Sequence, residues 1–133
     1  MTYLLDTNAI SALMRVDARV ATWLSSIAPD DRVVVCTITR GEILFGLERL
    51  APGRRRTELE EKATKLFAVL PCEPIPRAAG DRYASVKISQ QRRGLPLDEN
   101  DLWIAATALA MDATLVSRDG DFRAIEGLAV VEP

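Results

Sequence analysis

Short apolar runs alternate along this chain with longer stretches in which apolar residues recur at helical spacing. The runs of strand length are TYLLD (2–6), RVVVC (32–36), CEPIP (72–76), TLVS (114–117) and LAVVE (128–132). Between them the apolar positions recur every three or four residues, as on one face of a helix. Strands that alternate with helices predict an α/β fold, in which crossover helices flank a mostly parallel sheet.

The helices that this spacing predicts are 8–15, 18–27, Thr39–Leu50, Glu58–Leu70, Arg77–Gly94 and 101–112. Turn-forming residues separate them at 29–31, and APGRRR (51–56) is expected to be a loop between two helices. The segment 101–112 is so apolar and rich in alanine that it is predicted to be a buried central helix.

Composition places the chain among compact water-soluble proteins. It has 133 residues, of which 48% are hydrophobic and 27% charged, so one domain spanning 1–133 is expected. No run approaches the roughly 20 apolar residues that span a bilayer, and the N-terminus lacks the pattern of a secretory signal, so we expect a cytoplasmic protein without a membrane partner. The net charge of −2 gives no overall electrostatic sign of a nucleic-acid ligand.

The chain has no histidine, and this narrows its chemistry. The usual general base of hydrolases and the imidazole ligand of most zinc enzymes are both missing. Cys36 and Cys72 lack the spacing of a zinc site or a disulfide framework and are expected to pack. Trp23 and Trp103 are expected to pack in the core or in a dimer interface rather than to stack on bases. Catalysis would therefore have to use carboxylates, metal ions or cysteine.

Four acids follow or lie near the predicted carboxyl ends of strands, where open parallel sheets bind their ligands. Asp6 ends the first strand, Glu42 lies in the helix after the second, Asp101 begins the buried helix, and Asp119 follows TLVS. All four can face one crevice.

Each acid taken singly also has a purely structural explanation. Asp6 and Asp101 can cap helices, Asp119 and Asp121 can belong to a solvated turn, and TRGE (39–42) matches a capping box. Carboxylates that converge, however, raise one another's pKa unless cations neutralise them. An oxygen-only cluster favours magnesium or manganese, and such ions support phosphodiester hydrolysis by activating water.

Four motifs in this order carry a family resemblance that covers nearly the whole chain. They are LLDTN (4–8), TITRGEILFGL (37–47), NDLWIAATAL (100–109) and LVSRDGDF (115–122). In these motifs the chain resembles the PIN-domain ribonucleases, and among them the VapC toxins of bacterial toxin–antitoxin pairs. The resemblance implies a single PIN-like domain built as an α/β/α sandwich.

The resemblance also implies roles for individual residues. The metal-binding catalytic acids would be Asp6, Glu42, Asp101 and Asp119, with Asp121 as a frequent fifth member and Mg²⁺ (or Mn²⁺ as a substitute) as the cofactor. Thr7 and Asn8 would support Asp6 by hydrogen bonding. Asp98, one helical turn before Asp101, is interpreted as a helix N-cap rather than a ligand.

The function implied is that of a magnesium-dependent endoribonuclease that leaves a 5′-phosphate and a 3′-hydroxyl. Its RNA substrate would be a transfer RNA or a ribosomal RNA loop. A cognate VapB-type antitoxin would cover the active-site groove and would alone contact operator DNA, and the toxin would form a homodimer and a hetero-oligomer with the antitoxin. The main alternative is a catalytically idle PIN fold that acts as a binding module.

Two other magnesium-using α/β domains fit the motifs poorly. A receiver domain needs an acidic pair after the first strand and a lysine after a late one, and a haloacid-dehalogenase-like phosphatase needs two aspartates flanking one residue. LLDTN has one acid, and TLVSRD has no lysine.

Several basic residues have no assigned partner in the sequence. Arg118 could meet RNA, pair with an acid or stay solvated, and Arg92 and Arg93 could reach RNA near the site. The GRRR segment (53–56) is expected to lie in a loop.

Overall fold

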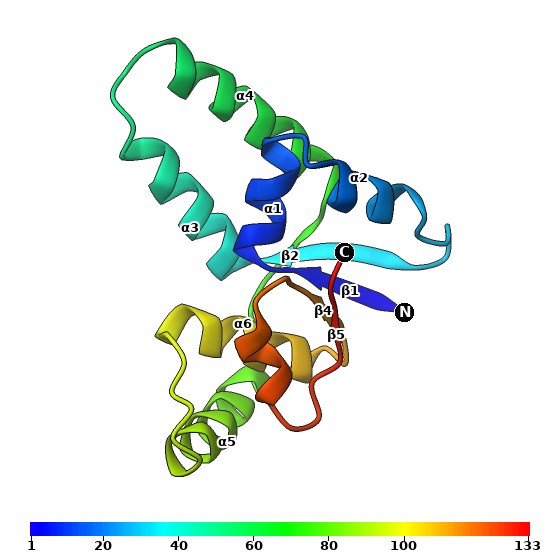
Figure 1. Ribbon diagram of the computed structural model, residues 1–133, viewed down its shortest axis with the longest axis vertical. Helices are drawn as coiled ribbons and strands as arrows, with labels where there is room; N and C mark the ends of the chain where they lie inside the picture. The colour runs from blue at the N-terminus through cyan, green and yellow to red at the C-terminus, as the bar shows by residue number, and fades with distance from the viewer.

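A computed structural model describes residues 1–133 and contains a five-stranded sheet of order β3-β2-β1-β4-β5 (Figure 1). The strands are β1 Thr2–Leu5, β2 Arg32–Cys36, β3 Cys72–Glu73, β4 Thr114–Val116 and β5 Val130–Val131. Every pair of neighbouring strands is parallel. The predicted α/β class is confirmed, and the sheet is entirely rather than mostly parallel.

Helices cover both faces of the sheet. They are α1 Thr7–Met14, α2 Ala18–Ser25, α3 Thr37–Glu48, α4 Arg54–Val69, α5 Ala78–Arg92 and α6 Glu99–Ala110, with a short 3₁₀ turn, η1, at Gly120–Ala124. Figure 1 shows α1 to α4 on one side of the sheet and α5, α6 and η1 on the other. This is the expected α/β/α sandwich. No helix is both long enough and apolar enough to cross a bilayer.

Alternate residues of the central strands supply two separate cores. Leu4 of β1 packs with α5 and α6, whereas the next residue, Leu5, packs with α1, α3 and α4. Val34 and Val35 of β2 divide in the same way. Side chains in a strand point alternately to its two faces, so a continuous apolar run is what a sheet buried on both faces requires.

The helix boundaries correct two local predictions. The GRRR segment is not a loop, because Gly53 is the N-cap of α4 and the three arginines form its first turn. Arg54 and Arg56 each pair with the glutamate four residues later, an arrangement that supports the start of a helix. The capping box at 39–42 is also wrong, since Cys36 is the N-cap of α3 and Thr39 lies inside the helix.

The remaining packing predictions hold in part. Cys36 is buried in the core, but Cys72 is exposed on the edge strand β3, so its predicted packing role is wrong. Trp23 meets the Tyr3 ring edge-on at 5.2 Å between ring centroids. Trp103 stacks on Tyr83 of α5 at 4.1 Å, so both tryptophans pack within the chain.

The turn between α1 and α2 forces a β-branched residue into a left-handed conformation. Val16 follows the C-cap of α1 with a φ of 57°. Its N–H donates to the Leu13 carbonyl, and the Asp17 N–H donates to the Ala12 carbonyl, which is the Schellman arrangement. Glycine or asparagine normally takes this position, since a Cβ-branched side chain is strained there.

We therefore expect Val16→Asn to stabilise the protein by about 1 kcal/mol. The Val16 side chain is 71% exposed, so little packing is lost in exchange. Urea unfolding measures the change. Val69→Asn is the matched control, because Val69 is 72% exposed but ends α4, and it should give no gain. Equal changes in the two variants would show that strain at Val16 is not relieved.

Candidate functional site

The sheet brings the carboxyl ends of β1, β2 and β4 to one edge, and four acids are placed around that edge. Asp6 follows β1, Glu42 lies in the second turn of α3, Asp101 lies in the first turn of α6, and Asp119 follows β4. The fold thus brings together residues that are up to 113 positions apart in the chain, as the positions 6 and 119 show. Parallel pairing of β1 with β4 brings Asp6 and Asp119 to this edge, and α3 and α6 carry Glu42 and Asp101 to it.

Asp6 is the most deeply buried of the four acids, with only 3% of its surface exposed. Its carboxylate accepts a hydrogen bond of 2.8 Å from the Ala9 N–H, so it is also the N-cap of α1. Burial raises the pKa of Asp6, and the charges of Asp119 and Glu42 raise it further. The Ser117 hydroxyl and the Ala9 N–H oppose the rise in pKa by favouring the carboxylate.

The pKa of Asp101 is affected by each of the other three acids of the group. Its pKa is raised to about 6, first by burial and then by the nearby negative charges of Asp98, Asp119, Glu42 and Asp6. Coulomb interactions of this kind require carboxylates at short range. Asp98 caps α6, as predicted, by accepting a hydrogen bond from the Asn100 N–H at 3.2 Å.

Hydroxyl groups hold the acids in place, but with different partners from those expected. Thr7 donates a hydrogen bond of 2.6 Å to Glu42 rather than to Asp6. Asn8 is exposed and makes no hydrogen bond to Asp6. The supporting hydroxyl beside Asp6 belongs instead to Ser117, which is buried and also accepts a hydrogen bond of 3.0 Å from the Asp119 N–H.

Sequence reasoning missed Ser117. The available signal was a serine that ends an apolar strand directly before an acidic turn. A hydroxyl at such a position is buried by its strand and must find a polar partner near the strand end.

Asp121 lies at the margin of the group. It is exposed, and its backbone N–H donates a 2.9 Å hydrogen bond to the Asp119 carboxylate, which caps η1. Its charge is not among those that raise the pKa of Asp6 or Asp101. Asp119 therefore forms part of a turn, as its purely structural explanation predicted, and is also a member of the acidic group.

The Arg118 side chain does not pair with Asp119 or Asp121, its acidic neighbours in the sequence. Its guanidinium forms two hydrogen bonds, of 2.7 and 3.1 Å, with the carboxylate of Asp17, the N-cap of α2. These bonds hold the pKa of Asp17 at about 2. Of the three roles left open for Arg118, pairing with an acid is the one observed. The pair links the loop that carries Asp119 to a helix 101 residues earlier.

Arg93 also has a structural partner. Its guanidinium donates a hydrogen bond of 2.5 Å to the Ala124 carbonyl and so ties the end of α5 to η1. Arg92 ends α5 and is exposed.

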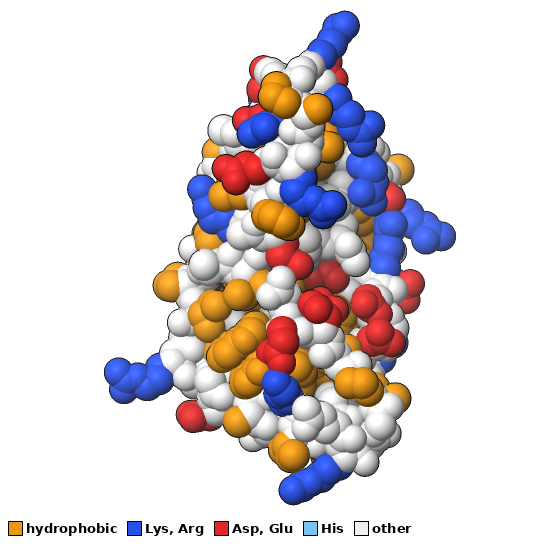
Figure 2. All heavy atoms as spheres, turned by 90° about the vertical axis from the view of Figure 1, so that its left-hand side faces the viewer, with side chains coloured by type: hydrophobic (Ala, Val, Ile, Leu, Met, Phe, Trp, Pro, Cys, Tyr) orange, Lys and Arg blue, Asp and Glu red, His pale blue; other side chains and the backbone are white.

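No cation of the protein neutralises the four acids. None of the seven ion pairs includes Asp6, Glu42, Asp101 or Asp119. Figure 2 shows acidic side chains gathered across the middle of one face, with basic side chains mainly above them. Protonation, which the raised pKa of Asp101 favours, or a bound cation would relieve the repulsion within such a group.

The donor set fits a magnesium or manganese ion. It consists of carboxylate oxygens from four separate elements, without imidazole or thiolate. No three acidic side chains are yet drawn together tightly enough to enclose an ion. Binding would therefore require side-chain rotation about backbone positions that the sheet already fixes.

Comparison with known proteins places this fold and site in context. The family model described as PIN domain matches residues 3–128. Ribonuclease VapC1 of Haemophilus influenzae strain R2866 is 34% identical over 124 residues, which cover 90% of this chain and 87% of that protein. The structure of VapBC2 from Rickettsia felis, bound to a DNA fragment from its promoter, matches with a TM-score of 0.91 and 21% identity over 100% of this chain and 99% of that one.

A third match is the crystal structure of VapBC-5 from Mycobacterium tuberculosis, described as a member of the VapBC family of toxin–antitoxin systems. It has a TM-score of 0.75 and 26% identity, and the match covers 98% of this chain and 96% of that one.

The raised pKa of Asp101 gives a test of the acidic group in protein freed of metal by EDTA. The folded state holds the Asp101 proton up to about pH 6, whereas an unfolded chain releases it near pH 3.9. This contribution to stability is present below pH 4 and is lost as the pH rises through 6. Asp101→Asn should therefore unfold at higher urea than wild type at pH 7, by on the order of 1 kcal/mol after allowance for solvent screening.

The same comparison at pH 4.5 should show a smaller difference between wild type and Asp101→Asn. Asp30→Asn, in the exposed turn before β2, controls for the loss of one negative charge. A gain in Asp101→Asn that is equal at both pH values would contradict the electrostatic explanation.

Proposed function

The chain belongs to the PIN-domain family and is a VapC-type ribonuclease, and from this we propose that it cuts RNA with a metal ion held by Asp6, Glu42, Asp101 and Asp119. The observation that carries the proposal is the group of four coupled carboxylates at one sheet edge, which no arginine or lysine neutralises. We further propose that residues 1–133 act as one PIN domain and as the toxin of a toxin–antitoxin pair.

The metal, magnesium with manganese as a substitute, would lower the pKa of a water and stabilise charge on the leaving oxygen of the phosphodiester. The chain's own residues prepare the site for it. The Ala9 N–H holds the carboxylate of Asp6, the Ser117 hydroxyl favours its ionised form, and the Thr7 hydroxyl holds the carboxylate of Glu42. These hydrogen bonds orient the two carboxylates before a metal ion binds, and rotation of acidic side chains would complete the site.

Asp119 is oriented through its backbone as well as its side chain. Its N–H donates to Ser117, and its carboxylate receives the Asp121 N–H. The Arg118–Asp17 pair anchors the same loop from its outer side. We propose Asp121 as a peripheral fifth member that contributes charge rather than a fixed ligand atom.

The products proposed are a 5′-phosphate and a 3′-hydroxyl, and the substrate is a transfer RNA or a ribosomal RNA loop.

A VapB-type antitoxin would inhibit the enzyme and supply the contact with operator DNA. The VapBC2 and VapBC-5 structures support this partnership, since the first is bound to promoter DNA and the second is a toxin–antitoxin system. A homodimer is proposed on the family resemblance. Mapping cleavage ends in total RNA after induced expression would identify the substrate.

A catalytically idle binding module is the competing proposal. The presence of all four motif acids, Asp6, Glu42, Asp101 and Asp119, argues against it.

Replacing Asp6 or Asp101 with asparagine should abolish RNA cleavage in magnesium and leave the fold intact. Asparagine keeps the size and one oxygen of aspartate but loses the charge that binds the cation. Cleavage of total RNA, with the far-ultraviolet circular dichroism spectrum, measures both effects. Asp30→Asn should cleave at the wild-type rate, and EDTA should stop cleavage until magnesium is restored.

The proposal fails if Asp101→Asn cuts RNA at the wild-type rate after contaminating nucleases have been excluded. Cleavage that persists in EDTA would remove the metal from the mechanism.

A further inference from the structure

A groove leads away from the acidic group between α1, α3 and α4. It has a volume of about 260 Å³, and Thr7 and Glu42 line its inner end. Figure 1 shows α1 between the other two helices. The groove follows α1 from Thr7 to Arg15, beyond its last residue, and the eight residues of this helix rise by about 12 Å. It can therefore hold a short stretch of an extended polymer whose reacting group lies at Glu42.

Two arginines flank the outer part of this groove. Arg15, the C-cap of α1, and Arg55, in the first turn of α4, both line it. Neither takes part in any of the seven ion pairs or in any side-chain hydrogen bond. Both guanidinium groups are thus free to bind an anion.

The sequence of α4 explains why Arg55 alone among three consecutive arginines is free. Arg54 and Arg56 have glutamates four residues later and pair with them at 3.1 and 2.8 Å. Four residues after Arg55 comes Leu59, which cannot form an ion pair and which lines the same groove. The helix thus neutralises the two neighbours and leaves one positive charge beside the groove.

The floor of the groove is apolar. The residues that form it are Met14, Ile43, Leu47, Leu50 and Leu59. Apolar side chains between positive charges suit a strand of nucleic acid, because bases and riboses offer apolar faces while phosphates meet the arginines. Such contacts position the strand without reading its sequence.

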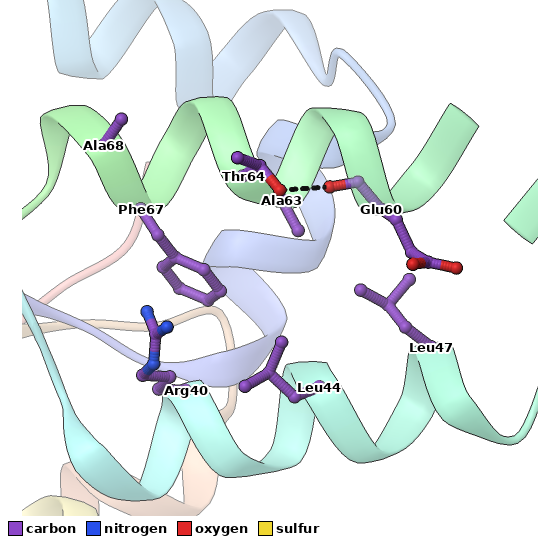
Figure 3. A pocket seen from close by; sticks show the side chains of 8 residues that line it. All are labelled: Arg40, Leu44, Leu47, Glu60, Ala63, Thr64, Phe67 and Ala68. Atoms are coloured by element: carbon purple, nitrogen blue, oxygen red, sulfur yellow. Dashed lines mark hydrogen bonds between the residues drawn. The ribbon is translucent and has the colours of Figure 1, made fainter. Parts of the chain in front are cut away.

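A larger cavity between α3 and α4, of about 330 Å³, lacks these features (Figure 3). None of the four acids lines it, and its one arginine, Arg40, lies over the Phe67 ring at 4.9 Å. Of these two cavities, the groove that begins at Glu42 is the one that combines unpaired arginines with one of the four acids.

We propose that a single strand of RNA lies in the groove, with the phosphate to be cut at the acidic end and neighbouring phosphates bound by Arg15 and Arg55. The inference rests on the proposed ribonuclease function and names the path of its substrate. Arg15 and Arg55 contribute affinity through the RNA backbone, so the choice of RNA sequence is made elsewhere.

Binding of a fluorescein-labelled, unstructured RNA oligonucleotide to the full-length Asp101→Asn protein tests the path without cleavage. Fluorescence anisotropy over a salt series gives the slope of log K against log salt concentration. Removing one phosphate-binding arginine should reduce the magnitude of this slope by about 0.7 for a single strand. Arg15→Gln and Arg55→Gln, each added to Asp101→Asn, should each do so, and Arg55→Lys, which keeps the positive charge, should retain the parent slope.

Arg54→Gln is the matched control, because Arg54 lies on the same turn of α4, has a side chain that is 92% exposed, and does not line the groove. It should keep the parent slope. In the cleaving protein, Arg55→Gln should raise KM for the oligonucleotide more than it lowers kcat, and Arg54→Gln should change neither.

If the Asp101→Asn protein binds RNA and the Arg15→Gln, Arg55→Gln and Arg54→Gln variants all keep its slope, the groove does not bind RNA. It would then be a candidate binding site for a segment of a protein partner. Failure of this kind leaves RNA cleavage by the wild-type protein intact, so it is distinct from failure of the proposed function. A wild-type protein that neither binds nor cuts RNA would overturn both.

Discussion

Electrostatic repulsion among four carboxylates is the constraint around which this molecule is organised. A parallel sheet directs the ends of β1, β2 and β4 to one edge, and acids from four elements meet there without a compensating arginine or lysine. The two apolar cores on either side of the sheet hold these acids at fixed backbone positions against their repulsion. Burial, together with the neighbouring negative charges, raises the pKa of Asp101, and a divalent cation would supply the counter-charge.

Residues at this edge combine structural and chemical roles. Asp6 caps α1 while it belongs to the acidic group, and Asp119 caps η1 in the same way. A helix cap restricts its own side chain, so capping also gives the carboxylate a defined direction. The structural and functional explanations of these acids, which compete when only the sequence is considered, are therefore compatible in the folded chain.

The alternation of apolar runs and helical spacing was sufficient to predict the α/β class. The positions of Asp6 and Asp119 after strands indicated that these two converge, whereas Glu42 and Asp101 lie in helices and were assigned to the group with the help of the family resemblance. Hydrogen-bond partners could not be predicted. Thr7 bonds to Glu42, 35 residues away, because the direction of its side chain depends on how α1 packs on α3. Arg118 meets Asp17 across 101 residues for the same kind of reason. Proline and glycine at 52–53 suggested a loop that extends to Arg56. In the structure α4 begins at Arg54, where an i,i+4 ion pair with Glu58 stabilises its first turn.

The outermost strands of the sheet are only two residues long. Pro71 and Pro74 flank β3 and lack backbone N–H donors, and β5 ends at Val131, two residues before Pro133. Such edges offer almost no ladder for another strand to join, which protects against edge-to-edge aggregation. A protein partner or a second copy of this chain must then associate through helical surfaces and side chains, so its binding can be altered by point substitution without disturbing the sheet.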